Sequence, residues 1–302
     1  MEDLVTPAPA AVGVGVWIRL LRPAQWVKNL FVLAALLFSG RATEIPAILA
    51  AFVAFVAFCL LSSCVYVLND VADREADRAH PIKRNRPLAA GRIGVGSAVA
   101  LGGALGVGGL AMAYAVAPAV ALTGALYLGL NVLYTLRLKR VVLLDVFSLA
   151  AFFLLRILAG AAAVEVTPSI WLLLCGGLLA LYLGFAKRRH ELLLLGDGST
   201  AHREVLAHYS PVFLDQMSVV LLAVTIVSYI MYTVFSETAV AVGSNWLVYS
   251  AVFVLYGVFR YLYLVHQREG GSPTETLLTD AAIMIDVLLW LAYCGWAIYR
   301  PF

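Results

Sequence analysis

Residues 45–70 read IPAILAAFVAFVAFCLLSSCVYVLND, and this stretch decides the fold class. It carries no charge before its last residue, and a helix needs about 20 apolar residues to cross a hydrocarbon core of about 30 Å. Backbone groups inside lipid must be hydrogen-bonded internally, which favours a helix for such a run. Over the whole chain 63% of residues are hydrophobic and 13% are charged, unlike an ordinary soluble domain. The sequence therefore predicts an all-α integral membrane protein.

Similar apolar runs recur along the chain and predict a bundle of about nine transmembrane helices. Their ranges are 26–40, 45–68, 94–114, 117–136, 142–164, 168–186, 212–236, 245–265 and 279–299. The first range is short and begins with the polar residues WVKN, so we expect it to be tilted or partly interfacial. We expect residues 1–15 to form a disordered tail and residues 16–302 to form a single domain.

Lys and Arg residues predict the orientation, because basic loops are retained in the cytoplasm. With the N-terminus inside, most of the 21 Lys and Arg residues fall on the cytoplasmic side, which is where we expect the polar chemistry. This topology explains the basic residues, so no nucleic-acid partner is expected. Cys59, Cys64, Cys175 and Cys294 lie in apolar runs and are expected to be inert packing residues.

Three aspartates follow the second predicted span, in NDVADREAD at residues 69–77. If the helix continues, Asp70, Asp73 and Asp77 lie within about 60° of one another on one face, and Glu75 points away. Such carboxylates repel one another unless a cation joins them, and hard oxygen ligands suit Mg²⁺, which keeps positions open for substrate phosphates. We expect the three aspartates, with Asn69 close by, to hold Mg²⁺ and to be the catalytic residues.

Basic residues follow at once in HPIKRNRP, at residues 80–87. Lys83, Arg84 and Arg86 stand between two prolines, which predicts a stiff, extended turn that presents them together to phosphate oxygens. The alternative is that these acids and bases pair with one another while the basic residues anchor the loop to anionic lipid. The three aspartates on one helix face and the two prolines that flank the basic residues favour a site for a metal ion and a diphosphate.

These motifs resemble those of a known family. NDVADREAD resembles the first aspartate-rich motif, NDxxDxxxD, of the UbiA superfamily of intramembrane prenyltransferases, whose architecture is nine helices with charged cytoplasmic loops after spans 2 and 6. Four segments are most similar to its decaprenyl-phosphate phosphoribosyltransferase branch. They are LRPAQWVKN (21–29), HPIKRNRP (80–87), LDVFSLAAFFLLRILAGA (144–161) and FAKRRHEL (185–192).

The resemblance implies Mg²⁺-dependent transfer of 5-phosphoribose from phosphoribosyl diphosphate (PRPP) to a polyprenyl phosphate such as decaprenyl phosphate, with release of diphosphate. It also implies a bacterial inner membrane, a site facing the cytoplasm and a role in cell-wall precursor synthesis. The wider superfamily has a second acidic motif after span 6. Here that loop is dominated by Lys187, Arg188 and Arg189, beside Glu191 and Asp197. Basic residues in place of acidic ones are expected in this loop, because these substrates carry additional phosphate groups whose negative charge must be neutralised.

Arg156 is an ionisable residue inside the fifth predicted span, where a charge is costly and usually faces the bundle interior. It shares a helix face with Asp145 but lies about 16 Å from it along the axis, so the two cannot pair. We expect its partner to be a substrate phosphate or, alternatively, a carboxylate such as Asp286.

Gln25, Lys28 and Asn29 open the first predicted span, and the resemblance makes them candidate PRPP contacts. The alternative is that Trp26 and Lys28 anchor the chain at the membrane interface.

Five other residues are weaker candidates. Tyr134 and Lys139 follow a superfamily pattern and are candidate substrate contacts, with an interfacial role as the alternative. Thr274, Glu275 and Asp280 precede the last span and are candidates for ribose or metal contacts, although Thr274 could equally cap a short helix.

Two other functions remain open. One is an aromatic or haem prenyltransferase that uses a prenyl diphosphate donor. The other is a non-enzymatic transporter or lipid-binding protein, which would favour charges or broken helices near the midplane of several spans. Only Arg156 and Asp286 have such positions.

Overall fold

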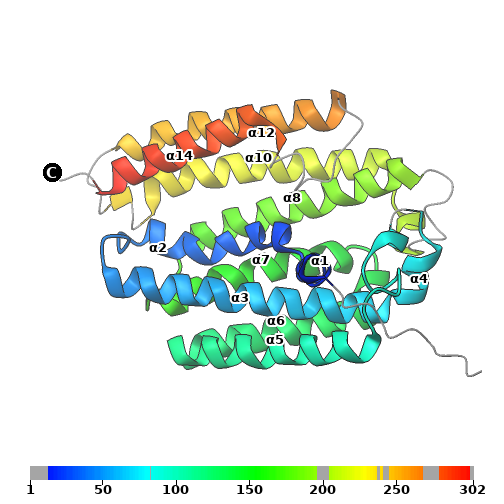
Figure 1. Cartoon of the computed structure of the whole chain (residues 1–302). Coiled ribbons are helices and arrows are strands. Elements are labelled where there is room, and N and C mark those ends of the chain that lie inside the picture. Colours follow the sequence, from blue (N-terminus) through cyan, green and yellow to red (C-terminus); the bar gives the residue numbers. More distant parts are fainter. Residues whose placement is uncertain are drawn as a thin grey trace, which may run out of the picture.

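The computed structural model describes residues 13–81, 83–195, 204–236, 239–240, 245–267 and 279–299. Within these ranges the chain is a bundle of helices that run side by side, with no strand (Figure 1). Eight helical segments of the described chain are long and apolar enough to span a membrane, which confirms the predicted fold class. The long helices are α3 (Ile45–Ala72), α5 (Val95–Val116), α6 (Pro118–Leu136), α7 (Leu144–Ala163), α8 (Ile170–Leu195), α10 (Pro211–Phe235), α12 (Ala251–Gln267) and α14 (Ala281–Tyr299).

Short helices connect the long ones. They are α1 (Val14–Leu21), α4 (Arg74–Ala79), η2 (Lys83–Asn85), η3 (Leu138–Arg140), η5 (Glu204–His208) and η6 (Asn245–Ser250), where η marks a 3₁₀ helix. Helix α1 begins at Val14, so the last two residues of the predicted tail are helical. The rest of that tail, residues 1–12, lies outside the described residues.

The first predicted span has an unusual form. It consists of an 11-residue 3₁₀ helix, η1 (Pro23–Leu33), followed by a short α-helix, α2 (Ala34–Phe38). A 3₁₀ helix rises about 2.0 Å per residue and an α-helix about 1.5 Å, so this segment covers about 30 Å. It therefore matches the thickness of a hydrocarbon core although it has too few residues to do so as an α-helix.

The winding of η1 determines which of its side chains face the bundle. With three residues per turn, Trp26, Asn29 and Val32 lie above one another on one face. Trp26 Nε1 donates to Ser63 Oγ of α3 at 3.0 Å, so this indole is turned into the bundle. On the side of α7, a Cβ added to Gly160 would lie 1.8 Å from the carbonyl oxygen of Val32. Only glycine allows η1 to approach α7 this closely.

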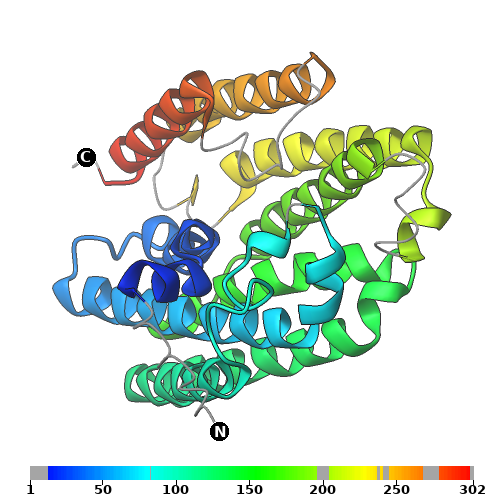
Figure 2. The same ribbon diagram turned by 45° about the vertical axis from the view of Figure 1, so that its right-hand side comes forward.

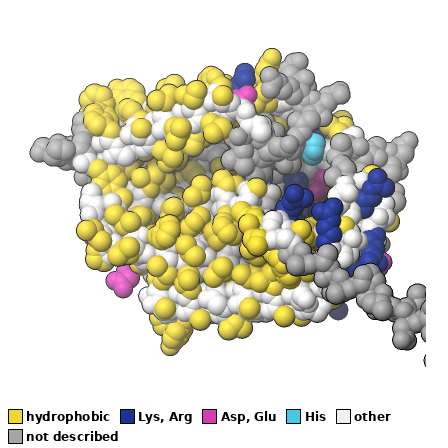
Figure 3. Space-filling view, viewed as in Figure 1, with side chains coloured by type: hydrophobic (Ala, Val, Ile, Leu, Met, Phe, Trp, Pro, Cys, Tyr) yellow, Lys and Arg dark blue, Asp and Glu magenta, His cyan; other side chains and the backbone are white. Residues whose placement is uncertain are grey.

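The charged side chains of the described residues lie mainly at one end of the bundle. The right-hand end of Figure 1 holds α4 and η5, and it comes forward in Figure 2. Lys and Arg side chains gather at this end, while apolar side chains cover the long helices (Figure 3). Val107 of α5, Val252 of α12 and Leu288 of α14 are 72%, 64% and 63% exposed, as expected for surfaces that face lipid. We refer to this end as the charged end, and its cytoplasmic orientation stays a prediction.

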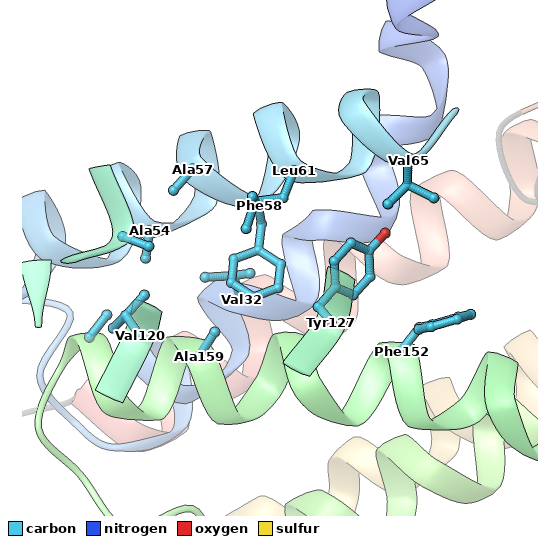
Figure 4. Close-up of a cluster of buried hydrophobic side chains, with 12 residues drawn as sticks. Val32, Ala54, Ala57, Phe58, Leu61, Val65, Val120, Tyr127, Phe152 and Ala159 are labelled. Atoms are coloured by element: carbon cyan, nitrogen blue, oxygen red, sulfur yellow. The ribbon is translucent and has the colours of Figure 1, made fainter. Parts of the chain in front are cut away.

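The largest apolar core lies between α3, α6 and α7 (Figure 4). Phe58 and Leu61 of α3 pack with Tyr127 of α6 and Phe152 of α7, and all four are buried. Helix α5 covers the other side of α3, where a Cβ on Gly109 would come within 2.8 Å of the Leu61 side chain. Small residues at this contact allow close helix packing, as expected inside a membrane.

Candidate active site

The aspartate motif lies at the charged end, where α3 is followed by α4. Helix α3 ends at Ala72 and α4 begins at Arg74, so the predicted continuous helix is interrupted at Asp73. The hydrogen-bond pattern nevertheless continues, because the amides of Asp73 and Asp77 donate to the carbonyls of Asn69 and Asp73, each at 2.8 Å. Asn69, Asp73 and Asp77 therefore follow one another at intervals of one helical turn.

Asp70 is the most enclosed of the three aspartates that were predicted to bind metal. Its side chain is 3% exposed and forms ion pairs with both Arg22 and Arg86. Arg86 Nη1 lies 3.1 Å from Asp70 Oδ1 and 2.6 Å from Asp77 Oδ2, so one guanidinium joins the two carboxylates. Two arginines compensate the charge of Asp70. Asp77 is 4% exposed and shares Arg86 with it, so both carboxylates belong to one buried ion-pair network. The metal-binding and catalytic roles of Asp70 stay a prediction.

Arg22 is a site residue that the sequence prediction missed. It has a φ of 53° between α1 and η1, a conformation that residues other than glycine adopt at a cost. Its guanidinium binds Asp70 and lies over the ring of Tyr66, with 5.3 Å between Cζ and the ring centroid. These contacts hold the strained residue in place. An arginine immediately before the proline that opens the first span is the sequence signal that could have identified it.

Asp73 is the accessible acid of the motif. Its side chain is 43% exposed, and Lys139 Nζ lies 3.2 Å from its Oδ1. One turn earlier, Asn69 Oδ1 accepts a hydrogen bond from Thr135 Oγ1 at 2.8 Å. Asn69 and Asp73 thus both face the junction of α6 and η3.

The motif can be tested for its fit to Mg²⁺. Asp73 and Asp77 offer two carboxylates one turn apart, and Asn69 offers an amide oxygen one turn earlier. Mg²⁺ commonly takes one or two carboxylates and fills its other positions with water and substrate phosphates. The described residues contain no group of three His, Cys, Asp or Glu placed to hold a metal ion. The donor set therefore fits a cation that binds together with a phosphate ligand, and it does not fit a closed protein cage.

The basic segment after α4 is the short 3₁₀ turn η2, where an extended turn was predicted. Lys83 and Arg84 are exposed, whereas Arg86 turns inward to the acids. The acids and bases of this loop therefore pair in part, as the alternative interpretation held. Desolvation and the neighbouring Arg86 lower the pKa of Lys83, while the charges of Asp77, Glu191 and Asp73 act in the opposite direction.

The basic residues at the end of α8 have partners within the bundle. Arg188 has a fully buried side chain, with its Nε 2.7 Å from Asp145 Oδ2, and it also forms an ion pair with Glu191. Arg189 Nε lies 2.5 Å from Asp215 Oδ1 of α10. Both arginines are thus held by carboxylates, and their phosphate contacts stay a prediction. These positions also make Glu191 an internal ion-pair partner.

Hydrogen bonds extend the Arg188 ion pair to neighbouring elements. The Tyr209 hydroxyl donates to Asp145 Oδ1 at 2.7 Å and accepts the Leu143 N–H at 2.8 Å. Burial raises the pKa of Tyr209, so this hydroxyl keeps its proton at neutral pH. Arg188 Nη2 donates to the hydroxyl of Tyr134 at 3.4 Å, so this candidate substrate contact also belongs to the network.

Asp280 caps α14. Its Oδ1 accepts the Ile283 N–H at 3.1 Å, and Arg260 Nη2 lies 2.9 Å from its Oδ2. This position accounts for Asp280 without a ribose or metal ligand. Three other predicted residues, Asp197, Thr274 and Glu275, lie outside the described residues.

Arg156 is buried in α7 and is 3% exposed. Its Nε donates to Asn29 Oδ1 at 2.7 Å, its Nη1 to the Phe152 carbonyl at 2.7 Å and its Nη2 to the Tyr127 hydroxyl at 3.1 Å. All three acceptors are neutral, and no Asp or Glu among the described residues forms an ion pair with Arg156. The carboxylate of Asp286, which was the alternative partner, packs against α12 instead.

The polar residues of η1 lie on two faces. Lys28 Nζ donates to Gln25 Oε1 at 2.7 Å on one face. Asn29, on the inner face, donates to Ser62 Oγ at 3.1 Å and accepts from Arg156. With three residues per turn, the Gln25 and Lys28 side chains therefore lie on a different face of η1 from Asn29.

Comparisons with known proteins agree with this geometry. The sequence matches the UbiA prenyltransferase family over residues 29–292. A Mycobacterium tuberculosis (strain H37Rv) protein named decaprenyl-phosphate phosphoribosyltransferase is 33% identical over 301 residues, which cover 98% of this chain and 98% of that protein. A Corynebacterium glutamicum protein of the same name is 32% identical over 286 residues, covering 93% of this chain and 86% of that protein.

A solved structure shares the fold. The structure of a UbiA homolog from Archaeoglobus fulgidus bound to GPP and Mg²⁺ aligns with a TM-score of 0.71, over 95% of this chain and 100% of that one. The two sequences are 19% identical, so this similarity establishes the arrangement of helices and nothing about the ligands of this chain.

Proposed function

Because the chain belongs to the UbiA prenyltransferase family, we propose that it transfers 5-phosphoribose from PRPP to a polyprenyl phosphate and releases diphosphate. The full-length relatives named decaprenyl-phosphate phosphoribosyltransferase support this choice of reaction and of a decaprenyl phosphate acceptor. We place the reaction at the charged end, on the cytoplasmic face of a bacterial inner membrane. The protein is then a multi-pass transferase that joins a water-soluble donor to a lipid acceptor.

The observation that carries this proposal is the balance of charge around the aspartate motif. Asp73 and Asp77 lie among the cations Lys83, Lys139 and Arg86. No second acidic pair faces them from the described part of α8, because its one carboxylate, Glu191, is bound to Arg188. PRPP carries a diphosphate and a separate 5-phosphate, and the acceptor adds a third phosphate group. These substrates supply the negative charge that such a site needs.

The proposed roles follow from the positions of the residues. Asp73 and Asp77, with Asn69 one turn away, would hold Mg²⁺, and when bound the metal supplies positive charge to the departing diphosphate. Arg86 exchanges its bond to Asp77 for the phosphate oxygens of the donor, which a guanidinium can bind two at a time. Lys83 neutralises the remaining donor charge from the exposed side.

The bond changes are simple. The bond between the anomeric carbon and the diphosphate oxygen breaks, and a bond from that carbon to an oxygen of the lipid phosphate forms. The lipid phosphate is already an anion at neutral pH, so no general base is required and no proton has to move. Positioning and charge stabilisation by the residues above supply the acceleration.

A two-arm assay tests this proposal. Purified protein in lipid nanodiscs receives Mg²⁺ with either radiolabelled PRPP and decaprenyl phosphate, or radiolabelled prenyl diphosphate and 4-hydroxybenzoate. We expect labelled lipid only in the first arm, and chelation of the metal should abolish it. Product only in the second arm would establish the aromatic prenyltransferase alternative. Lipid binding without product in either arm would favour the non-enzymatic alternative.

A further inference from the structure

The charge of Arg156 is not compensated by the described residues. A guanidinium stays protonated in proteins, so this group carries its charge even inside the bundle. Hydrogen bonds to Asn29, Phe152 and Tyr127 satisfy three of its five N–H groups but bring no negative charge. A buried charge without an opposite charge is costly unless an anion binds there.

The two remaining N–H groups suit one phosphate. The three bonds use one hydrogen each on Nε, Nη1 and Nη2, which leaves one N–H on each terminal nitrogen. A guanidinium can hold two oxygens of one phosphate with such a pair. The Asn29 amide and the Tyr127 hydroxyl are neutral acceptors, so a phosphate that replaces either of them strengthens the bond to Arg156.

This site is distinct from the aspartate motif. Asn29 bonds both Arg156 and Ser62, and Ser62 lies eight residues before Asp70 on α3. Eight residues of α-helix correspond to about 12 Å, so Arg156 lies deeper in the bundle than the acids.

The surroundings of Arg156 are aromatic and apolar. Its Cζ lies 4.8 Å from the ring centroid of Tyr127 and 5.5 Å from that of Phe153. Tyr127 and Phe152 belong to the apolar core between α3, α6 and α7 (Figure 4). These neighbours favour a phosphate carried on a hydrocarbon chain over one carried on a sugar, because a sugar needs polar partners for its hydroxyls.

We propose that Arg156, positioned by Asn29, forms a receptor for a phosphate monoester, and that its ligand is the phosphate of the isoprenoid acceptor. This assignment rests on the proposed function, which supplies two monoesters, the lipid phosphate and the 5-phosphate of the donor. It places the acceptor phosphate deeper than the diphosphate, which binds at Asp73 and Asp77. The nucleophile and the leaving group are then held by separate sets of residues.

Binding without turnover tests the receptor. Wild-type protein in detergent with EDTA and no PRPP is titrated with geranyl phosphate, geraniol, ribose 5-phosphate or inorganic phosphate, and affinity is measured by calorimetry. We expect binding of geranyl phosphate and none of geraniol. Arg156→Gln should weaken geranyl phosphate binding at least about tenfold. Arg156→Lys should have an intermediate affinity, because it keeps the charge but lacks the paired N–H groups of a guanidinium. Arg140→Gln, an exposed change of the same charge on η3, is the matched control and should bind normally.

The outcomes separate this proposal from its alternatives. If Arg156→Gln loses binding of ribose 5-phosphate but keeps binding of geranyl phosphate, the receptor belongs to the donor. That result would overturn the assignment to the acceptor. Unchanged binding of all four probes in a folded Arg156→Gln would make the arginine purely structural. A second measurement covers poor folding of that variant, because Arg156→Lys should raise KM for the lipid phosphate and leave KM for PRPP unchanged. If geranyl phosphate binding depends on Arg156 while the PRPP assay gives no labelled lipid, the receptor stands and the proposed reaction falls.

Discussion

Arg188 and Arg156 are two buried arginines with opposite surroundings. Arg188 is fully buried at the end of α8, and two carboxylates, Asp145 and Glu191, balance its charge. Arg156 is 3% exposed in α7 and has only neutral partners among the described residues. Burial alone therefore does not distinguish a structural arginine from one that binds a ligand. The charge of the partners distinguishes the two kinds of arginine. It predicts different effects of the same substitution on stability and on ligand binding at the two positions.

The largest expected effect on stability follows from Arg188→Gln. The change leaves the buried Asp145 without its arginine counter-ion, which costs about 3–5 kcal/mol in the free energy of unfolding. Arg156→Gln removes a charge that has no counter-ion but also removes hydrogen bonds to Asn29, Phe152 and Tyr127, so we expect a smaller loss of about 1–3 kcal/mol. Chemical unfolding in detergent measures both. Equal losses of stability in the two variants would remove the distinction between the arginines.

The second effect concerns the acids. Asp73→Asn removes an accessible carboxylate and should lower kcat at least about a hundredfold, or about 2.7 kcal/mol, with little change in Tm. Asp70→Asn leaves Arg22 and Arg86 with less negative charge to bind and should lower Tm more than Asp73→Asn does. Activity and Tm are measured on the same preparations. The reverse pattern would make Asp70 the metal ligand and Asp73 the structural residue.

A smaller effect is expected from Gly160→Ala. The added methyl group would overlap the Val32 carbonyl and push η1 away from α7, at a cost of about 1–3 kcal/mol. Because η1 carries Asn29, the variant should also bind geranyl phosphate more weakly. Gly103→Ala in α5, where nothing lies within 4 Å of the new Cβ, is the matched control and should be neutral or slightly stabilising. Normal phosphate binding in Gly160→Ala would argue against a positioning role for η1.

The smallest effect is expected from Tyr209→Phe. The hydroxyl bonds both the Asp145 carboxylate and the Leu143 amide, so its loss should cost about 1–2 kcal/mol in the free energy of unfolding. KM for PRPP and for the lipid should not change, because Tyr209 supports Arg188 and not the proposed phosphate receptor. A selective change in either KM would place the Arg188 network in the substrate site.

The fold was predictable because span length and apolarity depend on local sequence. The range 45–68 corresponds to α3, which continues to Ala72, and most other long helices match their predicted ranges to a similar degree. The exception is α8, which was predicted to end at residue 186 and continues to Leu195. The first span was predicted to be unusual, but its 3₁₀ winding was not foreseen. The segment packs closely against Gly160 of α7, a contact far along the chain that the local sequence does not reveal.

The location of the candidate site could be predicted from the sequence. The contacts made by its individual residues were less predictable. The aspartate motif and its basic neighbours do lie together at the charged end. Which of the acids can bind a ligand depends on ion pairs between distant parts of the chain. For example, Asp70 pairs with Arg22, which lies 48 residues earlier in the sequence. Likewise, the ion pair of Arg188 with Asp145 joins two different helices and could not be predicted from the local sequence.

The 3₁₀ winding of η1 also limits how this segment can vary. Each added or deleted residue between Pro23 and Leu33 would rotate everything that follows by about 120°, so Val32 would leave the groove at Gly160 unless the length changed by a multiple of three. A change of three residues would keep the faces in phase but alter the reach of the segment by about 6 Å, a fifth of the membrane core. Insertions and deletions should therefore be rare in this segment, even where single substitutions are tolerated.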